Sequence, residues 1–186
     1  MGAAAFRRRD GRMALAGAGG GLAPDVPSFV LVLWAGVVDR RGGAEIFDQL
    51  YFSPAWQAIM APSHSTPLWL AALAVGLLLR QPLLVAFTAS GLLHQAFDFA
   101  LHAEDAHRHL WPLSDWRYVS PISYWDPAHG GAIIAPLEAA LGMAFALLLR
   151  AALPSRGWRL GLTVVAALYG LAALGLTAYA LLDLLA

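Results

Sequence analysis

One run of apolar residues restricts the possible folds of this chain more than any other feature of its sequence. Residues 160–182, LGLTVVAALYGLAALGLTAYALL, contain no charged side chain. About 20 apolar residues in an α-helix cross the roughly 30 Å hydrocarbon core of a bilayer. The run therefore predicts a transmembrane helix. Lipid offers no water to backbone polar groups, so only helices or closed barrels cross it.

Other apolar segments predict that the chain crosses the membrane several times. Of its 186 residues, 59% are hydrophobic and 13% are charged, whereas about 25% are charged in an ordinary soluble domain. Segments 131–149 and 82–101 are long enough to span, while segment 67–79 is short unless its helix begins near Ala58. We expect an all-α, polytopic helical membrane protein with about four to five transmembrane helices.

The apolar segment 13–38 is interrupted, and we expect a broken helix there. A glycine-rich stretch over 17–21 is followed by the turn-like sequence Pro24-Asp25-Val26-Pro27. Broken helices persist at membrane depth only where they are buried in protein or line a cavity. We therefore expect the break, which contains Asp25, to be buried in protein or to line a cavity.

We expect residues 1–186 to form a single integral-membrane domain, with a basic tail over 1–12 and a His- and Trp-rich polar loop over 102–130 that caps one face. With five spans, the arginines divide unequally between the two sides. One side holds Arg7, Arg8, Arg9, Arg12, Arg80, Arg150, Arg156 and Arg159, and the other holds Arg40, Arg41, Arg108 and Arg117. The positive-inside rule then places the N-terminus in the cytoplasm. The use of Arg without Lys, with much Ala, Leu and Gly, is typical of a GC-rich bacterial genome, so we expect a multi-pass protein of the bacterial inner membrane.

Missing residue types exclude several classes of chemistry. The chain has no cysteine, which excludes disulfides, cysteine-bound zinc and iron–sulfur clusters. It also has no lysine, which excludes Schiff-base chemistry and a P-loop. Its formal net charge is zero, so we expect no nucleic-acid partner.

A stripe of histidines and aspartates is the most informative polar feature. Its members recur every three or four residues: His94, Asp98, His102, Asp105 and His109. A helix continuing from 82 to about 110 and ended by Pro112 would present all of them on one face. Imidazole and carboxylate one turn apart suit zinc, manganese or non-haem iron. The alternative is a His–Asp hydrogen-bond network that only joins helices.

Two further polar residues could complete a metal site. Asp25 lies at the break of the first segment, and His64 begins the short apolar segment. With His94 and Asp98 they would make a set of two imidazoles and two carboxylates from three segments. Alternatively, Asp25 is a turn residue and His64 an interfacial polar residue. Glu138, a lone glutamate in a span, stays outside this set.

These motifs resemble a known family over about residues 22–130. They are Pro24-Asp25, Ser63-His64-Ser65, Leu93-His94-x-x-x-Asp98 and Leu110-Trp111-Pro112, with the block WPLSDWR (111–117) and SYWDPAH (123–129). Together they resemble a bacterial subgroup of the membrane-bound, metal-dependent hydrolase-like proteins, which are also described as LexA-binding, inner-membrane-associated hydrolases.

The resemblance implies a multi-span helical protein with a metal site and hydrolase activity. It assigns Asp25, His64, His94 and Asp98 to that family's polar motifs. The second aspartate and the upstream histidine that are common in the family are absent here, where Pro27 and residues 59–63 stand instead. His102, Asp105 or His107 could then serve as alternative ligands.

We therefore expect an integral-membrane hydrolase in which a divalent metal, zinc before manganese or iron, activates water. The expected metal ligands are Asp25, His64, His94, Asp98 and His102, and Glu104, Asp105 and His107 are the candidates for proton transfer. The expected partners are the lipid bilayer and a lipid or lipid-linked ester, phosphoester or amide. The alternatives are a non-catalytic scaffold or partner-binding protein and a metal-handling or transport protein.

Overall fold

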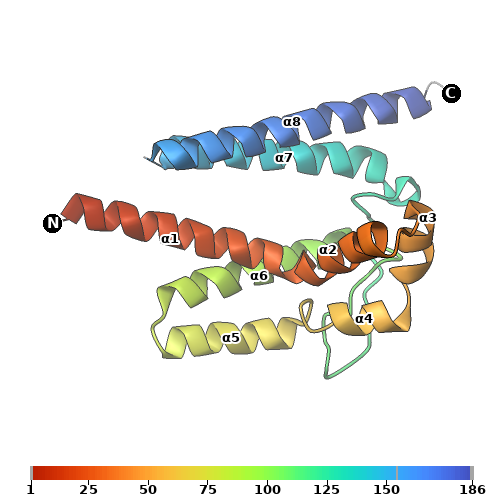
Figure 1. Ribbon diagram of the computed structural model, residues 1–186, viewed down its shortest axis with the longest axis horizontal. Helices are drawn as coiled ribbons and strands as arrows, with labels where there is room; N and C mark the ends of the chain where they lie inside the picture. Colours follow the sequence, from red (N-terminus) through yellow and green to blue (C-terminus); the bar gives the residue numbers. More distant parts are fainter. Residues whose placement is uncertain (1, 154, 185–186) are drawn as a thin grey trace. The chain divides into compact units, whose positions relative to one another are not determined.

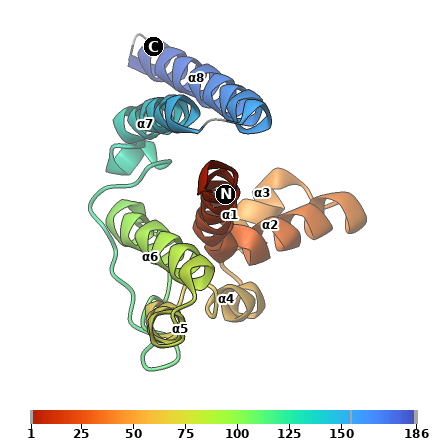
Figure 2. The same cartoon turned by 90° about the vertical axis from the view of Figure 1, so that its left-hand side faces the viewer.

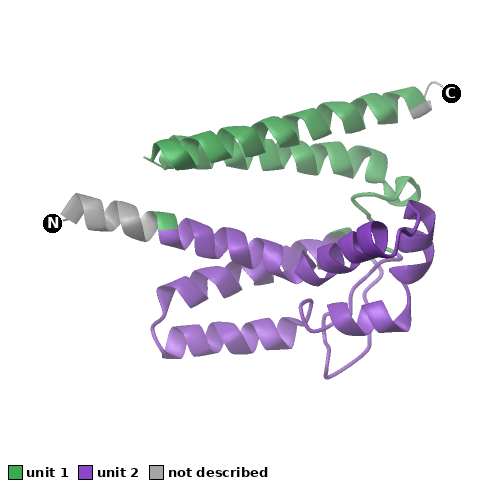
Figure 3. Cartoon of the chain, viewed as in Figure 1, with its two compact units in different colours: residues 1–11, 101–103, 120–186 green, residues 12–100, 104–119 purple. Residues whose placement is uncertain are grey.

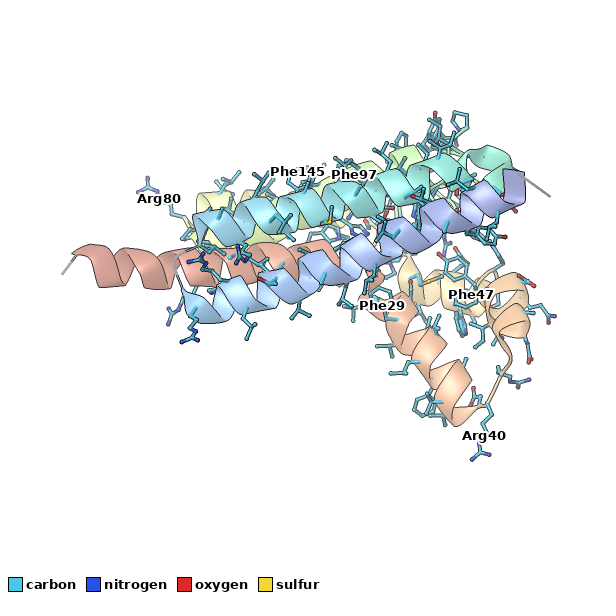
Figure 4. The ribbon with its side chains drawn as sticks, turned by 90° about the horizontal axis from the view of Figure 1, so that it is seen from above. Phe29, Arg40, Phe47, Arg80, Phe97 and Phe145 are labelled. Atoms are coloured by element: carbon cyan, nitrogen blue, oxygen red, sulfur yellow. The ribbon has the colours of Figure 1, made fainter. Side chains whose placement is uncertain are left out.

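The structure is a computed structural model that describes residues 2–153 and 155–184, and all regular elements in these residues are helices (Figure 1). Four helical segments are long and apolar enough to cross a membrane: Gly11–Val38, Pro82–Leu101, Gly131–Ala152 and Arg156–Leu182. The prediction of an all-α, polytopic membrane protein is thereby confirmed. Large apolar side chains project from these helices without protein cover, as Phe97 and Phe145 do in Figure 4.

The chain forms two compact units, which we describe separately (Figure 3). Unit 2 comprises Arg12–Ala100 and Glu104–Val119, and unit 1 includes Leu101–Ala103 and the chain from Ser120 onward. The single domain expected over residues 1–186, with its capping loop, stays a prediction.

Unit 1 is dominated by a pair of antiparallel helices, α7 (Gly131–Ala152) and α8 (Arg156–Leu184), which lie side by side in Figures 1 and 2. Gly142 lets them approach, because a Cβ there would lie 2.7 Å from the Tyr169 ring. The short 3-10 helix η4 (Pro127–His129) precedes α7. The spans predicted over 131–149 and 160–182 lie within these two helices.

Unit 2 begins with the broken segment that the sequence predicts. From Arg12 onward, helix α1 (Gly2–Leu22) belongs to unit 2 and gives way to the 3-10 turn η1 (Ala23–Asp25), then to α2 (Val26–Leu33) and the π-helical turn η2 (Trp34–Val38). Pro24 is buried at this break. In Figure 4, α2 departs from the line of α1 and carries Phe29 away from it, with Arg40 beyond its end.

The rest of unit 2 contains three short helices and a helical hairpin. The short helices are α3 (Gly43–Glu45), the π-helical η3 (Ile46–Leu50) and α4 (Pro54–Met60). The hairpin consists of α5 (Thr66–Leu78) and α6 (Pro82–Leu101), joined by a turn at Arg80 (Figures 1 and 4).

The structure shows that the condition for segment 67–79 to span, a helix beginning near Ala58, is not met. Helix α5 does not reach back toward Ala58, because Ser65 caps it by accepting from the Leu68 amide at 3.3 Å and Pro67 occupies its first turn. Its 13 residues span only about 20 Å, which is less than the hydrocarbon core. Alone, α5 therefore does not cross a bilayer.

The expectation that α6 continues to about residue 110 is wrong. The helix ends at Leu101, and the polar residues after it form a loop. Loop carbonyls bond elsewhere: His102 O accepts from the Ser120 amide at 3.0 Å, and His109 O accepts from the Thr66 amide at 2.8 Å. These hydrogen bonds take the place of the i→i+4 bonds of a continued helix. The polar stripe His94, Asp98, His102, Asp105 and His109 therefore does not lie on one helical face.

Close packing in unit 2 depends on two glycines. Gly20 of α1 is buried against the backbone of Phe87 in α6, where a Cβ would collide with the Phe87 carbonyl. Gly91 of α6 leaves room for the ring of Trp69 from α5. Trp69 also donates from Nε1 to Ser63 O at 2.7 Å, which ties α5 to the turn before His64.

Candidate metal centre

Unit 2 brings two imidazoles and two carboxylates into one cluster. His64 Nε2 lies 3.6 Å from Asp25 Oδ1 and 3.7 Å from Asp98 Oδ2. His94 Nε2 lies 3.6 Å from Asp25 Oδ2 and 3.1 Å from Asp98 Oδ2. Nitrogen and carboxylate ligands therefore alternate around a ring formed by residues from the η1 break, the turn before α5, and α6. We call these four residues the ring cluster.

Each member of the ring cluster is held by a local feature of the fold. Asp25 ends the 3-10 turn, and the Pro24 carbonyl beside it accepts a 2.8 Å hydrogen bond from Ser63 Oγ. This bond ties the break in the first segment to the turn that carries His64. Asp98 follows His94 by one helical turn on α6, so both side chains project from the same face.

The surroundings of His64 determine which ring nitrogen faces the cluster. The imidazole is fully buried, and its Nδ1 lies 3.1 Å from the Met60 carbonyl oxygen. Nδ1 also lies 3.2 Å from Ser63 Oγ. A carbonyl can only accept, so the tautomer that satisfies the Met60 contact carries its proton on Nδ1 and presents the Nε2 lone pair to Asp25 and Asp98. A lone pair facing carboxylate oxygens requires a cation or a proton between them. This backbone contact is typical of metal-binding histidines.

The ring geometry suits a metal ion. Ligands about 2.0–2.1 Å from a tetrahedral ion lie roughly 3.3 Å apart, close to the 3.1–3.7 Å separations in the ring cluster. Nε2 of His64 and Nε2 of His94 are buried and have no hydrogen-bond partner among the described residues. Asp25, His64 and His94 can hold a metal ion, as can His64, Asp98 and His107.

The ring cluster is closed on one side and accessible on the other. The side chains of His64 and Asp98 are 1% and 11% exposed, whereas those of His94 and Asp25 are 19% and 34% exposed. A ligand or water can therefore reach the cluster beside Asp25, where the first segment is broken. Catalytic zinc sites keep a coordination position for water beside their protein ligands, so access on this side is a requirement for catalysis at the cluster.

His107 lies against the buried side of the ring cluster. Its ring stacks on that of His64, with centroids 3.7 Å apart and planes 15° from parallel. The loop is held there by bonds to the start of α5: the Thr66 amide donates to His109 O at 2.8 Å, and Ser65 Oγ donates to Trp111 O. His107 therefore lies beside the ring cluster, and with His64 and Asp98 it forms one of the groups there that could hold a metal ion.

The other predicted site residues lie in different environments. His102 belongs to unit 1, where its ring meets Tyr124 edge-on at 5.1 Å, and it occurs in none of the candidate metal groups among the described residues. Glu104 is exposed and Asp105 is buried. Their predicted roles in ligation and proton transfer stay predictions. Glu138, which we placed outside the site, lines an apolar cavity of about 350 Å³ between α7 and α8.

Sequence reasoning missed the group that orients His64. The sequence analysis does not identify Met60, whose carbonyl oxygen lies 3.1 Å from His64 Nδ1. A usable signal was present: Met60 precedes His64 by one helical turn, at the end of a segment with helical periodicity. No sequence signal identifies the stacking of His107 on His64, because it depends on a loop bond to α5.

No protein-family model, curated protein or solved structure matches this chain. The resemblance to hydrolase-like proteins therefore stays a prediction. The chemistry of the ring cluster is the firmer basis for inferring a function.

Proposed function

We propose that this protein is an integral-membrane, metal-dependent hydrolase whose ion is held by Asp25, His64, His94 and Asp98. The observation that carries the proposal is the alternating ring of imidazole nitrogens and carboxylate oxygens, with Nδ1 of His64 directed at the Met60 carbonyl and Nε2 at the cluster. Zinc is the first choice, because it accepts nitrogen and oxygen ligands in this geometry. Manganese and iron suit the same ligands.

The residues around the ring cluster can support hydrolysis. A divalent ion held there would need a further coordination position for a water, as when zinc becomes five-coordinate, and would lower the pKa of that water so that it can act as the nucleophile. We assign the role of proton acceptor to His107, which stacks on His64 beside the cluster. Asp25, the most exposed ligand, faces the side from which a substrate can approach. Glu104 and Asp105 are further candidates for proton transfer.

The location of the ring cluster favours a membrane-associated substrate. His94 and Asp98 lie on a helix long and apolar enough to span, and Asp25 lies within another such segment. Ionisable groups at such positions face protein interiors or aqueous cavities and mark functional sites. We infer that the substrate is an ester, phosphoester or amide of a lipid or lipid-linked molecule.

The proposal predicts metal-dependent hydrolysis that requires His107. Protein purified in detergent without a His-tag and loaded with zinc should cleave members of an ester and phosphoester panel, and a chelator should abolish turnover. His107→Gln should lower kcat by about 10²–10⁴, the usual contribution of a general acid–base group, while bound metal stays near the wild-type level. The measurements are steady-state kinetics and metal content by mass spectrometry.

The matched control is His129→Gln, which changes a histidine of unit 1 and should leave kcat unchanged. Stoichiometric metal without any metal-dependent turnover would contradict the hydrolase assignment. A structural or metal-handling role would then be the better explanation of the ring cluster.

A further inference from the structure

Two arginines of the loop over residues 104–119 share one glutamine of α4. Arg108 donates from Nη2 to the Gln57 carbonyl at 2.7 Å, and Arg117 donates from Nη2 to Gln57 Oε1 at 3.2 Å. Burial lowers the pKa of Arg117, and the positive charge of Arg108 lowers it further. Two cations are therefore held close together in a partly buried setting, and we call them the arginine pair.

The arginine pair is incompletely neutralised. Among the described residues its one ion-pair partner is Asp115, whose Oδ1 lies 2.9 Å from Arg108 Nη1. That carboxylate is 81% exposed, and exposed ion pairs contribute little stability. Arg108 Nε is buried without a hydrogen-bond partner, and each guanidinium has more N–H donors than it uses here. The pair thus has both charge and donors to spare for an anion.

The side chains beside Arg117 are typical of the membrane interface. Trp116 and Tyr118 flank it and are 53% and 37% exposed, and Leu113 is 80% exposed. Tryptophan and tyrosine concentrate at the level of lipid headgroups. The anion most available at that level is the phosphate of a lipid. Guanidinium groups match phosphate oxygens with paired hydrogen bonds.

We infer that Arg108 and Arg117 bind the phosphate group of a membrane lipid or lipid-linked substrate. The pair is also close to the ring cluster, since Arg108 follows His107 directly and His107 stacks on His64. The inference narrows the substrate class to phosphate-bearing lipids. In that respect it rests on the proposed function, whereas phosphate binding itself does not.

A purely structural role explains only part of this arrangement. The Gln57 carbonyl also accepts from the Ala61 amide at 3.1 Å, so Arg108 caps the C-terminal end of α4, where a cation is favourable. Capping explains the presence of Arg108. It does not explain why a second cation, Arg117, lies beside Arg108 despite the electrostatic repulsion between them. A phosphate dianion between them supplies that reason.

The first test uses the unmodified protein, so it does not depend on whether a variant folds. Chelator-treated protein in uncharged detergent is reacted with phenylglyoxal, and modification of each arginine is measured by mass spectrometry. Short-chain phosphatidic acid should slow modification of Arg108 and Arg117 about tenfold, whereas Arg41, paired with exposed Glu45, should react at an unchanged rate. Short-chain phosphatidylcholine should protect less, because its phosphodiester carries one charge.

Inorganic phosphate distinguishes the source of the anion. Protection by phosphatidic acid at concentrations where inorganic phosphate has no effect identifies a lipid headgroup site, and equal protection by both identifies a site for the phosphate group alone. Protection by neither, or equal protection of Arg41, overturns the inference.

Variants separate this inference from the proposed function. Arg117→Gln should weaken phosphatidic acid binding about tenfold, and Arg41→Gln, the matched control, should not. Asp115→Asn should tighten binding about two- to threefold by removing a competing anion, whereas a structural ion pair would give no gain. Metal content should be normal in all three variants. If the protein holds metal but does not bind phosphate, the inference about the arginine pair fails. If it binds phosphate but holds no metal, the proposed metal site fails.

Discussion

The variant His94→Ala/Asp98→Ala is expected to purify without the near-stoichiometric metal that we expect in the wild type. It removes one imidazole and one carboxylate, both on α6 and 3.1 Å apart, so the proposed ion would lose two of its four protein ligands. A divalent ion needs deprotonated ligands in a preformed arrangement, and Asp25 and His64 alone do not provide one. The measurement is metal content by mass spectrometry on protein without a His-tag, before and after reloading with zinc.

Thermal stability gives an independent test of the same variant. Metal bound only to the folded state stabilises it by about 2.7 kcal/mol at a free concentration one hundred times the dissociation constant. A chelator should therefore lower the melting temperature of the wild type and leave that of the double variant unchanged. A well-folded wild type that takes up no metal even after reloading would refute the metal site, and the ring cluster would then be a structural His–Asp network.

The control for this experiment is His102→Ala. The sequence predicts His102 as a ligand, but its ring contacts Tyr124 in unit 1. We expect this variant to keep its metal and its response to the chelator. Loss of metal in His102→Ala would restore the ligand role that the stripe suggested.

Gly20→Ala is expected to be the most damaging single-methyl change in unit 2. The added Cβ would collide with the backbone carbonyl of Phe87, which cannot move away as a side chain can. Overpacking costs about 1–3 kcal/mol and more where no rotamer relieves it, and we expect the upper end. Since α1 leads to Asp25 and α6 carries His94, separating them should also weaken metal binding. Thermal unfolding in detergent and metal content are the measurements.

Gly17→Ala provides the matched control on the same helix. A Cβ at Gly17 meets no atom within 4 Å. Alanine has a higher helix propensity than glycine by up to about 1 kcal/mol, so this variant should be as stable as the wild type or slightly more so. Equal destabilisation by both substitutions would contradict the close approach of α1 and α6.

The sequence predicted those parts of the helical architecture whose positions along the chain depend on hydrophobicity alone. The span over 82–101 matches α6 at both ends, and the break near Asp25 occurs at Pro24, whereas the glycine-rich stretch over 17–21 remains helical within α1. The prediction that α6 extends to about residue 110 is wrong, because it depended only on the three- to four-residue spacing of the polar side chains. In the structure, His109 O bonds to the Thr66 amide instead of continuing the ladder, a long-range contact that spacing does not reveal.

The candidate site could be assembled in part from the sequence. The expectation that Asp25, His64, His94 and Asp98 would meet came from their positions in apolar segments, and the structure places these four side chains together. Their role in metal binding stays a prediction. The details were beyond sequence reasoning, because the tautomer of His64 and the stacking of His107 depend on backbone carbonyls and loop bonds that leave no residue-type signature.

The composition of unit 2 has a consequence for biosynthesis. The ring cluster and His107 all lie in the first 107 residues of the chain, and α7 and α8 contribute none of them. A ribosome making this protein therefore synthesises every residue of the ring cluster before it begins the C-terminal hairpin. Metal capture can then accompany the insertion of α6 and fix α1, the turn before α5, and α6 together while the remaining spans are still being synthesised.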